Sequence, residues 1–345
     1  MGLKHLDNYQ FWNDTDPGQP GTFASTSGTT IVANRLHQNI AGASGGALIS
    51  NNLTDQGTYV LNGRLNIVST GAFQPINEAI WQLNDNGNNQ CGLCVQPDNK
   101  LRFYRQSAFV PIAAASVLAM VFDNAITFYD FEAKFVIGNA GSVELRIAGG
   151  VQIGPTVVDN QDTANSTANS VALAAQSSGS QGIIMNWEHM IVMDGSGAAL
   201  NGNFIGPVDV ILLPPTGDGF YTAWNLTGAA TRWQAVQTAD GDTSYISASA
   251  VGTKNTFTHG NLPANSTAVI ATGIWCNARE DDAVTRGFKV LLRNTTPTDA
   301  LGGTEFFVGP DYLYFFQPLE VSLFTGIAWT VSEVNTVEYG VQVTT

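Results

Sequence analysis

Hydrophobic and polar residues alternate over short stretches of this chain, in the pattern that predicts β-strands. Runs rich in valine, isoleucine, phenylalanine, tyrosine and threonine are separated by glycine, asparagine, aspartate and proline, and clear examples read KFVIG, VELRIAG, FKVLLR and YLYFF. Apolar residues at the spacing of an amphipathic helix are scarce. Turn residues recur at the interval typical of β-sandwiches. We therefore predict an all-β chain of antiparallel, jelly-roll-like β-sandwich domains, in which stacked sheets each bury one face.

Chain length and one segment near the middle predict two domains in tandem. A length of 345 residues exceeds the usual domain size of about 150 residues. The run PVDVILL at 207–213 reads as a closing strand, and PPTGDG at 214–219 follows it with two prolines and two glycines, which strand interiors tolerate poorly. We place the boundary here and predict domains at 1–213 and 214–345. The polar stretch 157–182 is expected to be an exposed loop of the first domain.

Charge and hydropathy exclude several classes of function. Only 12% of the residues are charged and the formal net charge is -14, which repels phosphate backbones, so no nucleic acid is expected as a partner. The longest apolar run, 108–122, contains Pro111 and falls short of the roughly 20 residues that cross a bilayer. We interpret it as a core strand or a short buried helix and expect no membrane insertion. The N-terminal residues lack the apolar stretch of a secretory signal, so we expect assembly in a cytoplasm.

Cysteine usage favours buried, reduced thiols over a metal site. Cys91 and Cys94 form one CGLC pair, Cys276 lies far away in the sequence, and the four histidines are scattered singly. Zinc sites need a second pair at short spacing. The residues that flank the CGLC pair indicate a strand, a turn and a further strand, which is not the setting of a redox motif.

Two patterns suggest catalysis, and each has a structural interpretation that we prefer. The segment GASGG at 42–46 places Ser44 in a G-x-S-x-G pattern, but the residues that follow make no helix for a nucleophile turn, so a glycine-rich strand edge is favoured. Asp130 and Glu132 alternate along FYDFEAKF, as the acid pair of a glycosidase would. Lys134 continues the alternation, which indicates an outward polar face. We expect no enzymatic activity.

Calcium and glycans are the ligands that individual side chains suggest. Hard oxygen ligands on glycine-rich turns suit calcium, although aspartate also forms such turns for local reasons; the candidates are Asp194, Asp240, Asp242, Asp281 and Asp282. Aromatic faces stack on sugar rings, and polar flanks single out Trp12 and Trp81 as glycan contacts. Four further tryptophans lie in apolar runs and are predicted to be in the core: Trp224, Trp233, Trp275 and Trp329. No other cofactor is expected.

Several segments, in their order and spacing, are similar to those of a known group of proteins. In the first domain they are HLDNYQFW, GASGGALIS and DGSGAALNGNFIGPVDV, and in the second TAWNLTGAATRWQAV, DGDTSYI, CNAREDDAVTR, TGIAWT and VNTVEYGVQV. The first domain resembles the laminin-G or concanavalin A-like β-sandwich of tailed-bacteriophage proteins. The second resembles the domain that follows it in such proteins.

This resemblance implies a non-enzymatic structural component of a tailed-phage virion, exposed in multiple copies on the tail or head surface. Its partners would be other virion proteins, copies of itself and host-surface glycans, and its role host attachment or capsid decoration. The resemblance brings no catalytic residues. The alternative on the same scaffold is a carbohydrate-binding lectin or a glycan-active enzyme, because fold does not fix function.

Overall fold

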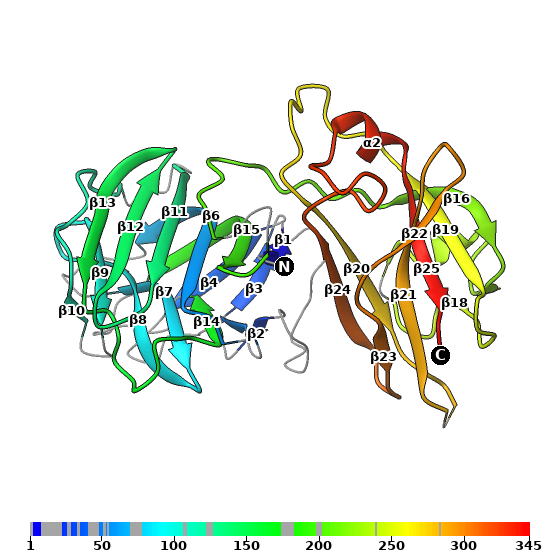
Figure 1. Ribbon diagram of the computed structural model, residues 1–345, viewed down its shortest axis with the longest axis horizontal. Coiled ribbons are helices and arrows are strands. Elements are labelled where there is room, and N and C mark those ends of the chain that lie inside the picture. Colours follow the sequence, from blue (N-terminus) through cyan, green and yellow to red (C-terminus); the bar gives the residue numbers. More distant parts are fainter. Residues whose placement is uncertain are drawn as a thin grey trace. The chain divides into compact units, whose positions relative to one another are not determined.

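The computed structural model divides the chain into two compact units, Met1–Val210 and Ile211–Thr345, which we call unit 1 and unit 2 (Figure 1). At residues 3–7, 23–25, 29–32, 35–40, 48–50, 69, 78, 183 and 184 only the backbone is described. Backbone and side chains are described at 53, 55–68, 79–105, 109–121, 127–173, 185–197, 202–238, 240–282 and 284–345.

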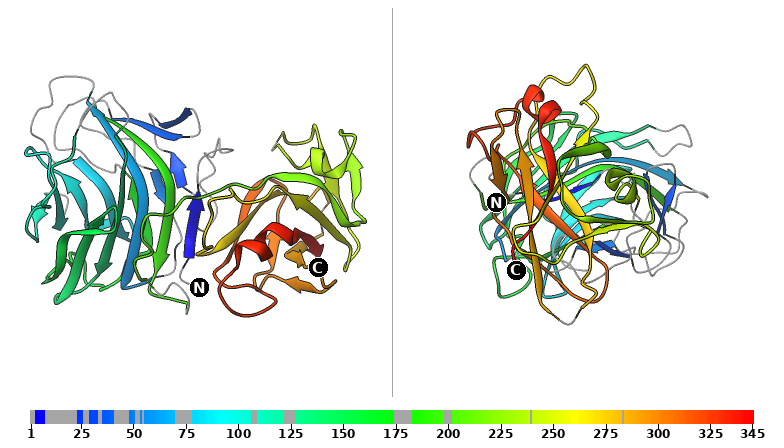
Figure 2. Two further views of the ribbon diagram at one scale, coloured as in Figure 1. Left: turned by 90° about the horizontal axis from the view of Figure 1, so that it is seen from above. Right: turned by 90° about the vertical axis from the view of Figure 1, so that its right-hand side faces the viewer.

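Unit 1 is built from two antiparallel sheets (Figures 1 and 2). Sheet A has eight strands, in the order β13-β12-β11-β6-β15-β4-β3 with β1 added on β15. Their bounds are β1 Leu3–Asp7, β3 Thr29–Val32, β4 Arg35–Ile40, β6 Thr58–Ser69, β11 Tyr129–Val136, β12 Gly141–Ile147, β13 Gly150–Val158 and β15 Ile183–Asp194. Sheet B has seven strands, in the order β10-β9-β8-β7-β14-β5-β2. Their bounds are β2 Phe23–Ser25, β5 Leu48–Ser50, β7 Glu78–Asp85, β8 Asn88–Val95, β9 Leu101–Arg105, β10 Val110–Pro111 and β14 Ser170–Leu173.

Alternation along the strands fills the space between the two sheets with apolar side chains. In β12, Val143, Leu145 and Ile147 are buried while the residues between them are partly exposed, as a strand with one covered face requires. Trp81 of sheet B packs on Phe131 of sheet A with ring centroids 4.5 Å apart, and both belong to the main core cluster. Burial of large apolar side chains at about 1.5–3 kcal/mol each makes this core the chief stabilising element of unit 1.

The outer face of sheet A is crossed by residues 202–210, which we call the strap. Glu132 Oε1 accepts hydrogen bonds from the backbone N–H groups of Ile205 at 2.6 Å and Gly206 at 3.0 Å. His189 Nδ1 accepts one from the N–H of Val210 at 2.9 Å. The strap is therefore held by side chains of the strands beneath it and not by a neighbouring strand.

Two sequence-based predictions are corrected by the strap. The run 207–213 is not a closing strand, because Pro207 lacks an N–H and the N–H of Val210 goes to a side chain. Glu132 does not face solvent beside Asp130 as part of an open polar surface, since the strap leaves its side chain only 3% exposed. The two carboxylates have separate partners, since Asp130 lies 3.6 Å from the Arg64 guanidinium and Glu132 accepts from the strap.

The stretch 157–182 is not one exposed loop. Ser170–Leu173 form β14, whose four residues are all buried between β7 and β5 in sheet B. Val171 and Leu173 supply its core-facing side chains, a short alternation that the polar surroundings conceal. The residues before it are held by Gln90, whose Oε1 accepts from two backbone N–H groups and whose Nε2 donates to two backbone carbonyls. Residues 174–182 lie outside the described part of the chain.

The apolar run at 108–122 is neither a core strand nor a buried helix over its described residues, 109–121. Only Val110–Pro111 form a strand, at the edge of sheet B. The rest is irregular, and Val117 is 78% exposed and Val121 50% exposed. The prediction failed because hydrophobicity alone does not say which face of a chain has a partner to pack against.

Unit 2 has a six-stranded antiparallel sheet, sheet C, in the order β16-β19-β25-β21-β22 with β23 on β21, and two two-stranded ribbons, β20-β24 and β17-β18. The strand bounds are β16 Pro215–Thr222, β17 Asn225–Thr227, β18 Tyr245–Ser247, β19 Lys254–His259, β20 Thr272–Ala278, β21 Arg286–Arg293, β22 Asp299–Leu301, β23 Phe306–Val308, β24 Leu313–Leu319 and β25 Glu338–Val343. Two short helices complete it, α1 Arg232–Ala235 and α2 Val331–Thr336. The all-β prediction is confirmed.

A separate core lies within unit 2. It contains Leu292 of β21, Leu319 of β24 and Val334 of α2 around Trp329. Trp329 is the one tryptophan of unit 2 that is fully in the core, at 4% exposure, and its Nε1 donates to the Leu319 carbonyl at 2.9 Å; the other three predicted core tryptophans of this unit are partly buried. None of the helices described is long and apolar enough to span a membrane.

Strand β16 corrects the expectation that PPTGDG is unsuited to a strand. Pro215 begins the strand, and Gly217 and Asp218 pair with β19. β16 is an edge strand, where a proline costs no ladder hydrogen bond on the open side. Register shifts between Pro215 and Gly217 and between Asp218 and Thr222 take up the irregular backbone.

Candidate functional site

The outer face of sheet B carries a row of polar side chains, with small residues at neighbouring strand positions. Trp81 and Leu83 of β7 point into the core, so Gln82 between them points outward. Gln82 lies opposite Gly92 of β8, which in turn lies opposite Tyr104 of β9. On the other side Gln82 pairs with Ala172, so small residues flank the carboxamide.

Tyr104 lies flat over Gly92. A Cβ atom at Gly92 would stand 2.6 Å from the tyrosine ring and 2.3 Å from the Trp81 carbonyl oxygen, so glycine is required at this strand position. The ring packs on Phe109 with centroids 4.7 Å apart, and its hydroxyl donates to Gln82 Oε1 at 3.4 Å. Burial raises the pKa of Tyr104 well above its ordinary value, so the hydroxyl stays protonated and acts as a donor.

The next row along the same face adds two asparagines. Asn84 and Asn89 are register partners on β7 and β8, and Asn84 Oδ1 accepts from Gln82 Nε2 at 2.5 Å. The Asn89 carboxamide lies close enough to the Tyr104 hydroxyl to act on its pKa by hydrogen bonding, although within the described residues neither its Nδ2 nor its Oδ1 has a partner at full hydrogen-bond geometry. An unsatisfied buried amide costs about 1–3 kcal/mol. We call Gln82, Asn84, Asn89 and Tyr104 the amide face.

An ion pair borders the amide face at the far end of β9. Arg102 lies opposite Cys94 and donates to both carboxylate oxygens of Asp98, from Nη1 at 2.8 Å and from Nη2 at 2.7 Å. The hydrogen bond from Arg102 lowers the pKa of Asp98 to about 2. The border is therefore neutral over the whole range of ordinary pH, and the amide face itself carries no charge.

The chemistry of the amide face is directional hydrogen bonding. Carboxamides both donate and accept, and a protonated tyrosine donates and accepts through one oxygen. Hydroxyl groups of a ligand, which also donate and accept, are the natural complement. Sequence reasoning missed these residues because it searched for aspartates and exposed tryptophans. One signal was present, since a glycine inside an apolar strand, as in CGLC, marks a close approach of another group.

The cysteines of CGLC lie on opposite faces of β8. Cys91 belongs to the main core and Cys94 packs with Tyr104 and Phe109 on the outer face. Both are free and buried, as the sequence indicated, and burial raises the pKa of Cys94 to about 12. Cys276 is free and partly exposed.

Several of the calcium candidates have local partners. Asp194 Oδ1 accepts from the backbone N–H of Ser196 at 2.9 Å, an Asx-type turn. Asp240 accepts from the N–H of Ser244 at 3.0 Å. Within the described residues, His, Cys, Asp and Glu form no cluster of three that could hold a metal ion.

The other aspartates of this set pair with arginines or lie in the open. Asp242 Oδ1 accepts from Arg279 Nη2 at 2.9 Å, and Asp282 Oδ2 from Arg286 Nη2 at 2.7 Å. Asp281 is exposed. These pairings describe surface ion pairs, and calcium binding at any of the five aspartates stays a prediction.

The tryptophans proposed as glycan contacts have different outcomes. Trp81 is 0% exposed and stacks on Trp187 with centroids 5.7 Å apart inside the core of unit 1. It has no free face for a sugar, so that prediction is corrected; its polar neighbours lie on the opposite face of the strand. Trp12 and the G-x-S-x-G serine, Ser44, lie outside the described side chains.

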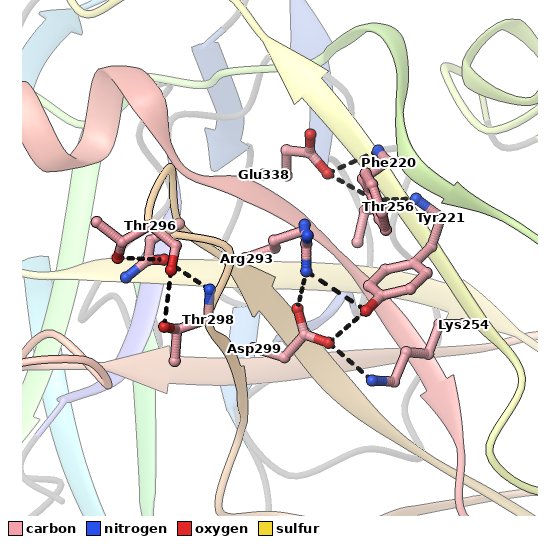
Figure 3. A network of polar contacts seen from close by, with 10 residues as sticks. Phe220, Tyr221, Lys254, Thr256, Arg293, Thr296, Thr298, Asp299 and Glu338 are labelled. Atoms are coloured by element: carbon pink, nitrogen blue, oxygen red, sulfur yellow. Dashed lines mark hydrogen bonds and ion pairs between the residues drawn. The ribbon is translucent and has the colours of Figure 1, made fainter.

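Unit 2 contains a second polar cluster that sequence reasoning did not find (Figure 3). Asp299 Oδ2 accepts from Lys254 Nζ and from the Tyr221 hydroxyl, each at 2.7 Å. Asp299 Oδ1 accepts from Arg293 Nη1 at 2.7 Å. The four residues come from four strands, β16, β19, β21 and β22, so no local motif could have grouped them.

Comparison with known proteins identifies no family for this chain. No protein-family model matches the chain, and no curated protein matches it. Among solved structures, an alginate lyase is similar at 12% identity and TM-score 0.37, covering 54% of this chain and 95% of its own. A carbohydrate recognition domain is similar at 11% and 0.37, covering 55% and 97%. A Bacillus subtilis protein of unknown function with a galectin-like fold is similar at 9% and 0.38, covering 56% and 96%. Each of these similarities covers little more than half of this chain.

These similarities correct one expectation and leave another without support. From the sequence we expected a protein without enzymatic activity. An alginate lyase is among the solved structures that are similar to this chain, so the expectation that excluded catalysis was wrong. Nothing in the comparisons indicates a phage particle. The virion role rests on the sequence resemblance alone and stays a prediction, as do the virion partners and localisation.

Proposed function

We propose that this protein binds saccharides through the amide face of sheet B. The observation that carries the proposal is the Asn89 carboxamide beside Tyr104, whose Nδ2 and Oδ1 meet no partner at full hydrogen-bond geometry within the described residues. A folded chain retains such a cost where a ligand or water supplies the missing partners. Sugar hydroxyls are suited to this face, because they donate to carboxamide oxygens and accept from carboxamide N–H groups, and Gln82 is its partly exposed member beside the buried Asn84 and Tyr104.

The charge of the protein favours an uncharged saccharide. The chain has a formal net charge of -14, which disfavours polyanions through long-range repulsion. At the border, Arg102 is neutralised by Asp98 in a bidentate pair. Recognition on the amide face therefore depends on hydroxyl geometry and not on charge.

A glycan array of neutral and uronic acid oligosaccharides, probed with the full chain and its variants, tests this proposal. We expect Asn89→Ala and Gln82→Ala each to weaken binding of the recognised glycan about tenfold, the loss of one to two hydrogen bonds at ~1 kcal/mol each. Gln237→Ala, an exposed glutamine of unit 2, is the matched control and is expected to bind as the wild type does.

Thermal melting of the same proteins separates a binding role from a structural one. Asn89→Ala removes an unsatisfied amide, so its melting temperature is expected to be equal to or above that of the wild type while binding falls. The proposal fails if the wild type binds no glycan on the array, or if both variants bind as tightly as the control. Release of sugar products from a bound polysaccharide would extend the same face to catalysis.

A further inference from the structure

Unit 2 presents an aromatic ring to solvent on the edge strand of sheet C. Phe220 of β16 is 65% exposed, and a large apolar side chain in the open is unremarkable by itself. Phe307 of β23, at 55% exposed, is a comparable case. What distinguishes Phe220 is the set of contacts that hold its ring and its backbone in place.

Three contacts fix Phe220. The Arg293 guanidinium lies over its ring, 3.9 Å from the centroid, and Tyr221 meets the ring edge to face at 4.9 Å and 88°. The backbone N–H of Phe220 donates to Glu338 Oε2 at 2.8 Å. Because one face of the ring is against Arg293 and most of its surface is exposed, the opposite face is open. Phe220 is a rigid platform.

The residues beneath the platform are themselves immobilised. Asp299 binds Arg293 Nη1 and Lys254 Nζ at 2.7 Å each, and the side chain of Arg293 is only 11% exposed. Glu338 Oε2 also accepts from Thr256 Oγ1 at 2.7 Å, as Figure 3 shows. A ligand that binds on Phe220 therefore orders few additional side chains, and the loss of conformational entropy on binding is small.

Hydrogen-bonding groups of both kinds lie around the platform. Within the described part of the chain, Arg293 donates from Nη1 alone, which leaves its Nε and Nη2 as donors. Lys254 likewise has donors beyond the one that it gives to Asp299. Glu338 supplies an acceptor. Two cations and two carboxylates make the cluster neutral, and Glu338 repels a ligand carboxylate.

We infer that Phe220, Arg293, Lys254 and Glu338 form a second saccharide site, in which the C–H face of a neutral pyranose ring stacks on Phe220. Hydroxyls that extend past the edge of the Phe220 ring accept from Arg293 and Lys254 and donate to Glu338. Mixed donors and acceptors fit hydroxyls better than a carboxylate, which only accepts, and an aromatic face with convergent polar groups is the usual form of such a site. This inference does not depend on the amide face, which lies in the other unit.

Binding of the full chain to neutral oligosaccharides, measured by titration calorimetry with glycans chosen from the array, tests the second site. The experiment is made in the Gln82→Ala background, so that the amide face is weakened and the remaining binding reports on unit 2. Phe220→Ala is expected to lower this remaining affinity at least tenfold, whereas Phe220→Trp keeps or raises it. Phe307→Ala is the matched control and is expected to change the affinity less than twofold.

Several outcomes would overturn this inference. The first is that Phe220→Ala binds as tightly as its Gln82→Ala parent. The second is that Phe307→Ala loses as much affinity as Phe220→Ala does. The third is that the Gln82→Ala protein shows no remaining binding at all. A preference for uronic acid over neutral oligosaccharides in the Gln82→Ala background would also contradict the neutral ligand. Both phenylalanine variants should melt within a few degrees of the wild type. A change in affinity then reports on binding and not on folding. If the amide face fails its own test while Phe220→Ala abolishes binding, the second site stands alone.

Discussion

Asp299 shows how a single side chain organises a surface. Burial acts to raise the pKa of Asp299, but the hydrogen bonds from Lys254, Tyr221 and Arg293 outweigh it, and the pKa lies below its ordinary value. The same pairing raises the pKa of Lys254. The carboxylate is 21% exposed and Arg293 is 11% exposed, so removal of the charge leaves a mostly buried guanidinium without its partner.

We predict that Asp299→Asn destabilises unit 2 by about 1–3 kcal/mol, the range for loss of a hydrogen-bonded partner of a charged group. Urea denaturation at pH 7 measures it. Because the folded pKa of Asp299 is depressed, its contribution is present above the unfolded value of about 3.9 and disappears as the pH falls through the folded value. The difference between wild type and variant is therefore expected to shrink at pH 3 and below. The exposed Asp281→Asn serves as control, and an equal effect of both variants would contradict the argument.

At the scale of elements, the sequence predicted the well-patterned strands and missed those with context-dependent packing. β12 follows from its alternation, and β21 from the apolar run in FKVLLR. Helix α2, which begins with Thr330 accepting from the Glu333 N–H at 3.1 Å, was not predicted. β14 was missed because four residues between polar stretches give too short an alternation. β16 was missed because proline and glycine are tolerated only at an edge, and edge position is a property of the whole sheet.

The candidate site was less predictable than the fold for a similar reason. The amide face joins β7, β8 and β9, and its polar side chains become neighbours only through strand register. Alternation could have placed Gln82 and Tyr104 on outer faces, but it could not show that they share one row. The tryptophan search failed at Trp81 because polar neighbours in sequence lie on the other side of a strand.

The turn that joins β7 to β8 offers a test at this scale. Gly87 has φ +82°, and a Cβ atom added to it would meet nothing within 4 Å. The cost of Gly87→Ala is therefore the strain of an alanine at positive φ and not a steric clash. We predict a loss of about 1 kcal/mol in the free energy of unfolding of unit 1. Gly154→Ala in β13 also meets nothing within 4 Å, without a positive φ, and is expected to leave stability unchanged or slightly higher. Equal urea midpoints for the two variants would refute the strained-turn explanation.

At the scale of the whole molecule, separate cores in the two units predict separate responses. The main core cluster belongs to unit 1 and the Trp329 cluster to unit 2. We predict that calorimetry resolves two transitions, with Gly87→Ala lowering one and Asp299→Asn the other. A single transition that both variants lower equally would show that the units unfold together, and would also count against a boundary near residue 214.

The strap sets the shortest stretch of chain that can stand for unit 1 in any fragment study. The last strand of sheet A ends at Asp194, and secondary structure alone would suggest cutting soon after it. Such a cut removes the N–H donors of Ile205 and Gly206 from Glu132 and uncovers Arg146, whose guanidinium lies 4.0 Å from the Phe204 ring centroid. A fragment that retains the sandwich with its covered outer face therefore ends at Val210 or beyond.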